Sequence, residues 1–402
     1  MTQTVRALAS ELCEDVRNHL LHEVMSFWRS HALDQDGGYH TNLDCQGTLI
    51  ENEKNIWMQA RQVWTFSTLY REVDADPFWK RLAEHGRDYL ISSKAYAGNG
   101  RWNYLLDPVS GEVISGSVSI YTDCFCMMAL SACASIGEKR DLALIEATFE
   151  ALEKNLFNPD FKDVFPQKWQ PDTAIHGIYM IALNAAAESV PVLGFERVAP
   201  FMNRCIDVLF DVIWDADAQA LLECKRWNGQ RLPAPAGTAL NPGHNFEAAW
   251  FLMREAPKLG RQREAQKAAE LVKRVWALAK DPQGGVFYML DSEGKTPGPC
   301  DWHPVRALRW DEKVWWTHAE ALCALMFAAR QTSSSELMRE FSDLWRYCLT
   351  KFADFENGEW YFALHRNGLP RLTQKGGLQK AAFHIPRSLI QCYLLLKEMS
   401  EE

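Results

Sequence analysis

The sequence predicts an all-α fold, an (α/α)6 barrel in which six helix pairs close into a ring, with short β-hairpins in the loops at one end. Three observations support this prediction. A glycine-rich hairpin pattern recurs along the chain, amphipathic helices fill the intervals between its copies, and no linker or change of composition divides the 402 residues. We therefore expect residues 1–402 to form a single domain, which is large but within the size that toroidal folds reach.

The recurring pattern is a glycine followed by apolar or aromatic residues, an Asp or Asn, and a final glycine. GGYHTNLDCQG spans 37–47 and GGVFYMLDSEG spans 284–294, and looser copies lie at 100–111, 220–230 and 358–368. Apolar residues that alternate before an Asp-Gly or Asn-Gly turn predict a β-hairpin. The intervals fit a unit of about 60 to 75 residues, so the chain holds about six units.

Between these hairpins the sequence has helical periodicity. Residues 5–27 place apolar side chains at three- and four-residue steps, the pattern of an amphipathic helix. Further helices are expected at 56–72, 78–92, 118–136, 143–156, 174–190, 198–214, 245–256, 261–280, 313–330, 335–352 and 384–399. Two helices for each unit favour a closed ring over an open solenoid, because solenoid repeats are usually shorter and lack regular hairpins.

The composition argues against several classes of partner. A net charge of −9 disfavours nucleic acid and anionic membrane surfaces, which bind through clustered Lys and Arg. No apolar stretch reaches 18 residues, and the first residues carry acids without an apolar run, so neither a membrane span nor a signal peptide is expected. The eleven cysteines have no Cys-x-x-Cys spacing, which is typical of buried thiols in a reducing compartment. We expect a cytoplasmic location.

The first candidate for chemistry is His244 in GHNFEAAW, where a Pro- and Gly-rich loop, residues 231–243, leads into an expected helix. Glu247 follows one helical turn later, and a carboxylate beside an imidazole fixes its tautomer and raises its pKa. Such a pair suits general acid/base chemistry near neutral pH. The alternative is a histidine and an acid placed in the first helical turn for the helix dipole alone.

A second histidine, His384, lies at a similar junction, because Pro386 suits the first turn of the expected final helix. It could instead be a partly exposed capping residue. Two histidines at helix starts that line one cleft favour a catalytic site. Arg61 lies between Trp57 and Trp64 on one helical face, where a buried guanidinium would polarise a carbonyl or stack beside a sugar. On the surface it would only cover the aromatic rings.

Tryptophan and its neighbours in WWTHAE, residues 315–320, are candidates for sugar contact, although a tryptophan on a helix is more often part of the core. The candidates for substrate binding are Trp57, Tyr121, His176, Trp315, Trp316, His318 and Glu320. No metal site is expected, because the histidines lack His-x-His, His-x-x-x-His and HExxH spacing. The Gly-Lys-Thr within 291–296 falls in an expected hairpin turn without the preceding glycine of a P-loop.

Five segments in order, IWMQARQVWTFSTLYR, SIYTDCFCMMAL, NPGHNFEAAWFL, KVWWTHAEAL and KGGLQKAAFHIPRSL, resemble the N-acylglucosamine 2-epimerase family. That family also includes cellobiose 2-epimerases, mannose 2-epimerases and aldose–ketose isomerases. The resemblance extends from about residue 36 to 395 and implies an (α/α)6 barrel. The repeat count leads to the same fold without it.

The resemblance also implies roles for matching residues. His244 in GHxxEA and His384 in FHxPR match the two acid/base histidines of the family, and Arg61 in QxR matches its substrate arginine. Glu247 matches the carboxylate beside the first histidine, and WW at 315–316 matches a family motif. The implied activity is 2-epimerisation of an open-chain sugar. N-acetylglucosamine and N-acetylmannosamine are the first pair, and a mannose isomerase or a mannose or cellobiose 2-epimerase is the alternative.

Two further details bear on the substrate. His318, which follows Thr317, is closer to the N-acylglucosamine enzymes than to the disaccharide epimerases. Residues 174–194, AIHGIYMIALNAAAESVPVLG, match the family pattern poorly and leave the sugar open. The resemblance raises ATP as an allosteric activator rather than a required cofactor, and it leaves the chain as a monomer or a homodimer.

Epimerisation at carbon 2 removes a proton next to a carbonyl and returns it to the opposite face, through an enolate or enediolate that must be stabilised. Two histidines on opposite sides would move the proton, Arg61 would hold the oxyanion, and Glu247 would orient His244. An isomerase would return the proton to carbon 1 instead. A glycoside hydrolase would need two cleft carboxylates, with Asp123, Glu247 and Glu320 available, but paired histidines fit hydrolysis poorly. A non-catalytic binding protein is the last alternative.

Overall fold

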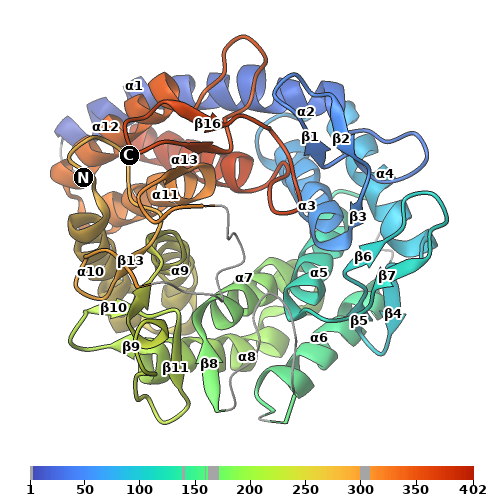
Figure 1. Cartoon of the computed structure of the whole chain (residues 1–402), viewed down its shortest axis with the longest axis horizontal. Helices are drawn as coiled ribbons and strands as arrows, with labels where there is room; N and C mark the ends of the chain where they lie inside the picture. The colour runs from blue at the N-terminus through green and yellow to red at the C-terminus, as the bar shows by residue number, and fades with distance from the viewer. Residues whose placement is uncertain (1–2, 138–140, 159, 162–171, 299–307) are drawn as a thin grey trace.

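The computed structural model describes residues 3–137, 141–158, 160–161, 172–298 and 308–402. Within these residues, six inner helices stand side by side in a ring, each packed against the next in chain order (Figure 1). They are α3 (Ile56–Glu72), α5 (Ile120–Ala134), α7 (His176–Leu193), α9 (Pro242–Glu255), α11 (Trp315–Thr332) and α13 (His384–Glu401). The ring closes because α13 packs against α3.

In the described part of the chain, six outer helical segments cover this ring. They are α1 (Gln3–Asn18) continued by η1 (His19–Val24) and α2 (Met25–His31), then α4 (Pro77–Ser92), α6 (Leu142–Leu156), α8 (Phe195–Asp207) continued by η2 (Val208–Ile213), α10 (Gln262–Ala279) and α12 (Ser335–Lys351). The outer helices α4, α6, α8, α10 and α12 each pack against the inner helix that precedes them in the chain, and α1 packs against α13. The predicted (α/α)6 barrel is confirmed.

The helices follow the predicted ranges closely, with one informative difference. The helix expected over 5–27 is interrupted by the π-helical turn η1, where buried His19 accepts a hydrogen bond from the indole N–H of Trp360 at 2.8 Å. Every residue of α5 is buried, because outer helices and neighbouring inner helices cover it on all sides. Among the described residues, no helix is both long and apolar enough to cross a membrane.

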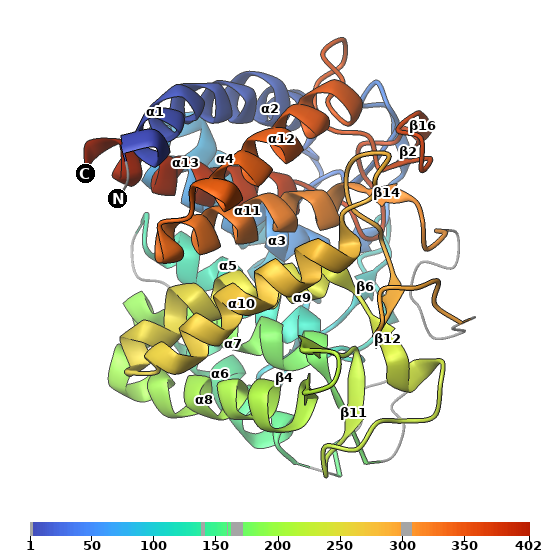
Figure 2. The same cartoon turned by 90° about the vertical axis from the view of Figure 1, so that its left-hand side faces the viewer.

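The strands gather at the end of the barrel where the inner helices begin, on the right of Figure 2. Four of them lead directly into an inner helix: β3 (Lys54–Asn55), β8 (Thr173–Ile175), β12 (Ala239–Leu240) and β14 (Lys313–Val314). The other strands are β1 (Asn42–Leu43), β2 (Leu49–Glu51), β4 (Tyr96–Gly98), β5 (Arg101–Trp102), β6 (Leu105–Leu106), β7 (Val113–Ser115), β9 (Trp214–Asp215), β10 (Ala220–Leu221), β11 (Cys224–Arg226), β13 (Leu290–Asp291), β15 (Ala363–Leu364) and β16 (Pro370–Leu372). The prediction of short hairpins in the loops at one end is therefore confirmed.

However, the strands of some predicted hairpins do not pair with each other. The pairs β1–β2, β4–β5, β9–β10, β6–β7 and β15–β16 are hairpins, and β3 and β14 extend the last two into three-stranded sheets. By contrast, β11 pairs with β8 and β13 pairs with β12, so the copies at 220–230 and 284–294 reach across to a neighbouring unit. A strand of two or three residues offers few hydrogen bonds of its own and pairs with the edge that packing brings beside it.

Buried ion pairs fix three of these loops. In each pair an aspartate that follows an outer helix accepts a hydrogen bond from the backbone N–H two residues later and also contacts a buried lysine. The pairs are Lys54–Asp34, Lys313–Asp281 and Lys375–Asp354, with N···O distances of 2.5, 2.7 and 3.0 Å. Because the lysines cannot reach water, the aspartates compensate their charge and hold the loop ends in place.

Candidate active site

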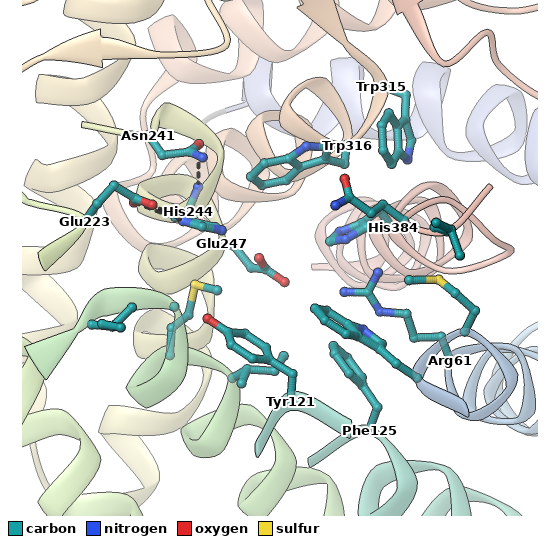
Figure 3. Close-up of a pocket in the computed structure, with 18 of the residues that line it drawn as sticks. Arg61, Tyr121, Phe125, Glu223, Asn241, His244, Glu247, Trp315, Trp316 and His384 are labelled. Carbon is teal, nitrogen blue, oxygen red and sulfur yellow. Dashed lines mark hydrogen bonds and ion pairs between the residues drawn. The ribbon is translucent and has the colours of Figure 1, made fainter. Parts of the chain in front are cut away.

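A pocket with a volume of about 120 Å³ opens at the loop end of the barrel and receives side chains from all six inner helices. Its aromatic lining includes Trp57, Tyr121, Trp315 and Trp316, as the sequence predicts. Its walls also carry Arg61, His244, Glu247 and His384 (Figure 3). The structure thus brings residues that lie more than 300 positions apart in the chain into one site.

His244 is positioned by the start of α9. Asn241 caps this helix by accepting a hydrogen bond from the backbone N–H of His244 at 3.3 Å, and Pro242 occupies the first helical position. The neighbouring Asn245 bonds both the N–H and the carbonyl of Leu221, each at 2.9 Å. This double contact fixes the loop that carries Glu223 beside the imidazole.

The carboxylate that holds His244 is Glu223 and not Glu247, so the predicted pairing is wrong. Both oxygens of Glu223 lie 2.9 Å from Nδ1 of His244, and the Glu223 side chain is buried. The side chain of Glu247 instead accepts a hydrogen bond from Arg387. The sequence missed Glu223 because a loop contact 21 residues away leaves no periodic signal.

The Glu223 carboxylate determines the charge of His244. Burial by itself would lower the pKa of His244, but the negative charge of Glu223 and its hydrogen bond outweigh this and raise the pKa above the ordinary value. Burial would raise the pKa of Glu223, yet the positive charge of His244 holds it at about 2. The pair therefore favours an imidazolium beside a carboxylate, with Nδ1–H donating to Glu223.

His384 begins α13 and is held in the same way by a different carboxylate. Its Nδ1 lies 2.7 Å from Oε1 of Glu320. The same oxygen accepts a hydrogen bond from Arg387 at 2.7 Å, and Oε2 of Glu320 accepts one from the indole N–H of Trp250 at 2.8 Å. Burial, followed by the positive charge of Arg61, lowers the pKa of His384 well below its ordinary value. Near neutral pH, His384 is therefore neutral and His244 carries a positive charge.

The two histidines lie on opposite sides of the pocket (Figure 3). Trp316 lies between them along one edge of the pocket, and Tyr121 and Phe125 lie along the facing edge. The ring centroid of Trp316 lies 5.3 Å from that of His244 and 5.5 Å from that of His384. A carboxylate holds Nδ1 of each imidazole, while Nε2 has no hydrogen bond to any residue that the structure describes. Each Nε2 is therefore available to a bound molecule.

Arg61 is a buried cation without an ion pair among the described residues. Its guanidinium carbon lies 4.9, 4.2 and 4.7 Å from the ring centroids of Trp57, Phe125 and Phe383. Burial lowers its pKa to about 9, and its Nε has no hydrogen-bond partner within the described chain. An incompletely compensated guanidinium at the pocket wall is suited to an anion that forms there.

Arg387 was not foreseen from the sequence. Its Nη2 donates to both Glu247 and Glu320, and the side chain is 1% exposed. Ligand atoms of Glu247, Glu320 and His384 lie within 4.8 Å of one another, a spacing that would suit a metal ion. The guanidinium already bonds both carboxylates, so a cation occupies this cluster. Its position three residues after His384, on the same helical face, was the available signal.

Three predicted residues lie elsewhere. His318 is fully buried outside the pocket lining, where its Nδ1 lies 2.8 Å from the carbonyl of Val314 and its Nε2 accepts from the N–H of Val286 at 3.0 Å. Burial lowers its pKa to about 3, and its predicted substrate contact is corrected to a structural role. His176 is buried behind the lining, with Nδ1 3.8 Å from Glu223. Glu320 holds His384, also from behind the lining.

The carboxylates do not form the pair that a glycoside hydrolase would need. Asp123 accepts hydrogen bonds from Arg101 at 2.5 Å and from the backbone N–H of Trp102 at 2.8 Å, away from the pocket. Of the carboxylates that line the pocket within the described chain, Glu223 is bound to His244 and Glu247 to Arg387. Neither is free to protonate a leaving group.

Replacing Glu223 by glutamine will lower the pKa of His244, because the carboxylate is what raises this pKa against burial. His244 will then lose its proton at lower pH than in the wild type, and the alkaline limb of any reaction that needs the imidazolium will shift to lower pH. The ring-proton NMR titration of His244 measures this. The exposed carboxylate variant Glu293→Gln is the control and should leave the titration unchanged. An unchanged titration in Glu223→Gln would remove Glu223 from this role.

Comparisons with known proteins agree with this geometry. A sequence model of the family described as N-acylglucosamine 2-epimerase (GlcNAc 2-epimerase) matches residues 37–387. The N-acylglucosamine 2-epimerase of Bos taurus is 28% identical over 99% of this chain and 93% of its own length, and that of Homo sapiens is 29% identical over 94% and 88%. A solved sugar epimerase from a ruminal bacterium superposes with a TM-score of 0.83 at 19% identity, covering 95% of this chain and 98% of that chain.

Proposed function

Since the chain belongs to the N-acylglucosamine 2-epimerase family, we propose that it interconverts N-acetylglucosamine and N-acetylmannosamine by moving the proton on carbon 2. One observation carries the proposal. Two histidines face the same pocket from opposite sides, each held through Nδ1 by a buried carboxylate, and their pKa values are displaced in opposite directions. The resting site therefore presents a base on one side and an acid on the other.

This arrangement suits proton removal and return at one carbon. In the open-chain sugar, neutral His384 takes the proton from carbon 2 through Nε2, and the electron pair moves onto the oxygen of carbon 1. The His244 imidazolium then gives its Nε2 proton to the opposite face of carbon 2 as the carbonyl forms again. The site ends with the charge on His384 and with His244 neutral, the state from which the other epimer reacts.

The negative charge that develops on the carbon 1 oxygen needs a partner inside a site that excludes water. We assign this to Arg61, whose guanidinium has no carboxylate partner in the described chain and lies beside His384 in the pocket (Figure 3). A buried, fixed cation stabilises such an anion more than water does. Glu223 and Glu320 act through the histidines: each keeps Nδ1–H engaged, so that only Nε2 exchanges protons with the sugar.

The test is proton NMR in heavy water with N-acetylglucosamine, N-acetylmannosamine, mannose and cellobiose, each supplied separately. Deuterium at carbon 2 together with the epimer of either N-acetyl sugar is the expected result. A ketose formed from mannose would make the protein an aldose–ketose isomerase, in which one histidine is dispensable. Epimerisation of mannose or cellobiose alone would overturn the proposed substrate. The absence of exchange with all four sugars would overturn the proposed function.

We also propose that the reaction requires no cofactor and that ATP acts at most as an allosteric activator. Activity will be unchanged after prolonged treatment with EDTA, because the Arg387 guanidinium already neutralises the carboxylate cluster that could bind a metal ion. Assays with and without ATP, before and after chelation, check this. A loss of activity that added divalent metal restores would contradict the proposal.

A further inference from the structure

One wall of the pocket, beside His244, is formed by small and aliphatic residues. It is formed by the first turns of α7, where Gly177, Met180 and Ile181 follow one another at steps of three and one residues, so that all three share a helical face. Ile175, in the strand that leads into α7, extends the wall. The three apolar side chains are at most 6% exposed, and what remains exposed faces the pocket.

This wall lies directly beside the reacting edge of His244. A Cβ atom built on Gly177 would lie 3.7 Å from Cε1 of His244, the ring carbon bonded to the Nε2 that faces the pocket. The same Cβ would lie only 2.4 Å from the Tyr121 hydroxyl oxygen, so a side chain at position 177 would displace this hydroxyl. Because Gly177 has no side chain, both the wall and the Tyr121 hydroxyl can lie close to the position that carbon 2 takes beside His244.

The chemistry of the wall discriminates between the groups that a sugar can carry on carbon 2. A free hydroxyl that is moved there from water loses its hydrogen bonds, which costs free energy unless they are replaced. The Tyr121 hydroxyl lies beside Gly177 of this wall, and burial raises the pKa of Tyr121 well above its ordinary value, so it remains a neutral donor. An acylamino group can use that donor through its carbonyl oxygen and place its methyl against Met180 and Ile181.

We propose that Ile175, Met180 and Ile181, with the Tyr121 hydroxyl at their edge, form the subsite for the acyl group on carbon 2 and select 2-acylamino sugars over 2-hydroxy sugars. The proposal rests on the proposed function, because it uses carbon 2 as the atom between His244 and His384.

The test separates binding from turnover by using open-chain analogues without a carbonyl, which cannot be epimerised. N-acetylglucosaminitol carries the acylamino group on carbon 2, and glucitol carries a hydroxyl there. Calorimetric titration of the wild-type protein should give at least about tenfold tighter binding of N-acetylglucosaminitol, the scale of one well-placed apolar group in a pocket. Equal affinities would overturn the proposal without any variant.

Variants then locate the preference. Met180→Gln, similar in size but polar, should reduce the preference to about threefold or less, whereas Met180→Leu should retain it. Met58→Gln is the matched control, because Met58 also lines the pocket but lies on α3 and not in this wall, and should affect both analogues equally. If Met180→Gln fails to fold, the wild-type comparison and the variant Ile181→Val are used instead. Ile181→Val should lose a smaller part of the preference for N-acetylglucosaminitol. A retained preference in Met180→Gln would overturn the assignment.

The two proposals can fail separately. Preferential binding of N-acetylglucosaminitol without turnover of any sugar would leave the subsite and remove the proposed function. Turnover of N-acetylmannosamine together with equal binding of the two analogues would leave the function and remove the subsite.

Discussion

Replacing His384 by asparagine will lower the rate of epimerisation by about two to four orders of magnitude, the range for a positioned acid or base. Asparagine preserves a hydrogen bond to Glu320 but has no group that can take a proton from carbon. The rate is measured as the appearance of one epimer from the other, by NMR or a coupled assay. A decrease of only a few-fold would remove His384 from the chemistry.

Exchange of the carbon 2 proton with deuterium from the solvent tests whether two separate bases act on the two faces of carbon 2. With His384 absent, His244 can still exchange the carbon 2 proton of the epimer whose proton faces it, so deuterium enters one epimer without inversion. His244→Asn should show the opposite preference. His365→Asn, at an exposed histidine of the β15–β16 hairpin, is the control and should leave both rates unchanged. Exchange into both epimers by either single variant would contradict the assignment of one histidine to each face.

Replacing Arg387 by methionine will lower the free energy of unfolding by about 3–5 kcal/mol, the usual cost of removing one partner from a buried ion pair. The guanidinium donates to Glu247 and Glu320, and all three side chains are at most 5% exposed. Without it, two carboxylates remain buried next to each other, and His384 loses a fixed partner. Urea unfolding of the variant, followed by circular dichroism, measures the effect.

Arg330→Met is the matched control for that experiment. Arg330 bridges Glu398 and Glu402 between the ends of α11 and α13, so it connects the same helices at the surface. An exposed pair of this kind contributes about 1 kcal/mol or less. The double variant Arg387→Met, Glu247→Gln should recover part of the lost stability, because it also removes one uncompensated charge. Equal losses in the Arg387 and Arg330 variants would show that burial does not determine the effect.

The parts of the fold that the sequence predicted are those with a local signal. The range of α3 was predicted to the residue because its periodic apolar pattern begins at a capped position, where Asn55 accepts a hydrogen bond from the N–H of Met58. The placement of His244 and His384 at helix starts was predicted because each follows a loop that ends in a helix-start signal. The pairing of β11 with β8 was not foreseen, since strands this short are placed by the helices they join and not by their own residues.

The site was predicted less completely, for a similar reason. Glu247 was assigned to His244 from helical spacing, but the partner is Glu223, which the contact of Asn245 with Leu221 brings back from a separate loop. A spacing rule sees neighbours on one helix and not a side chain delivered by tertiary packing. The burial of His318 was missed likewise, because Val286, whose N–H donates to Nε2 of His318, lies in a separate loop packed beside α11.

The contact between α13 and α3 that closes the ring determines when activity can arise during synthesis. Arg61 emerges from the ribosome early and His384 only after every other inner helix, so no nascent chain that lacks α13 has both sides of the pocket. At about 5–20 residues per second the nascent ring stays open for many seconds. During that interval α3 and α11 expose the flanks that α13 later covers. Synthesis of the final helix is therefore the step that closes the ring and completes the pocket.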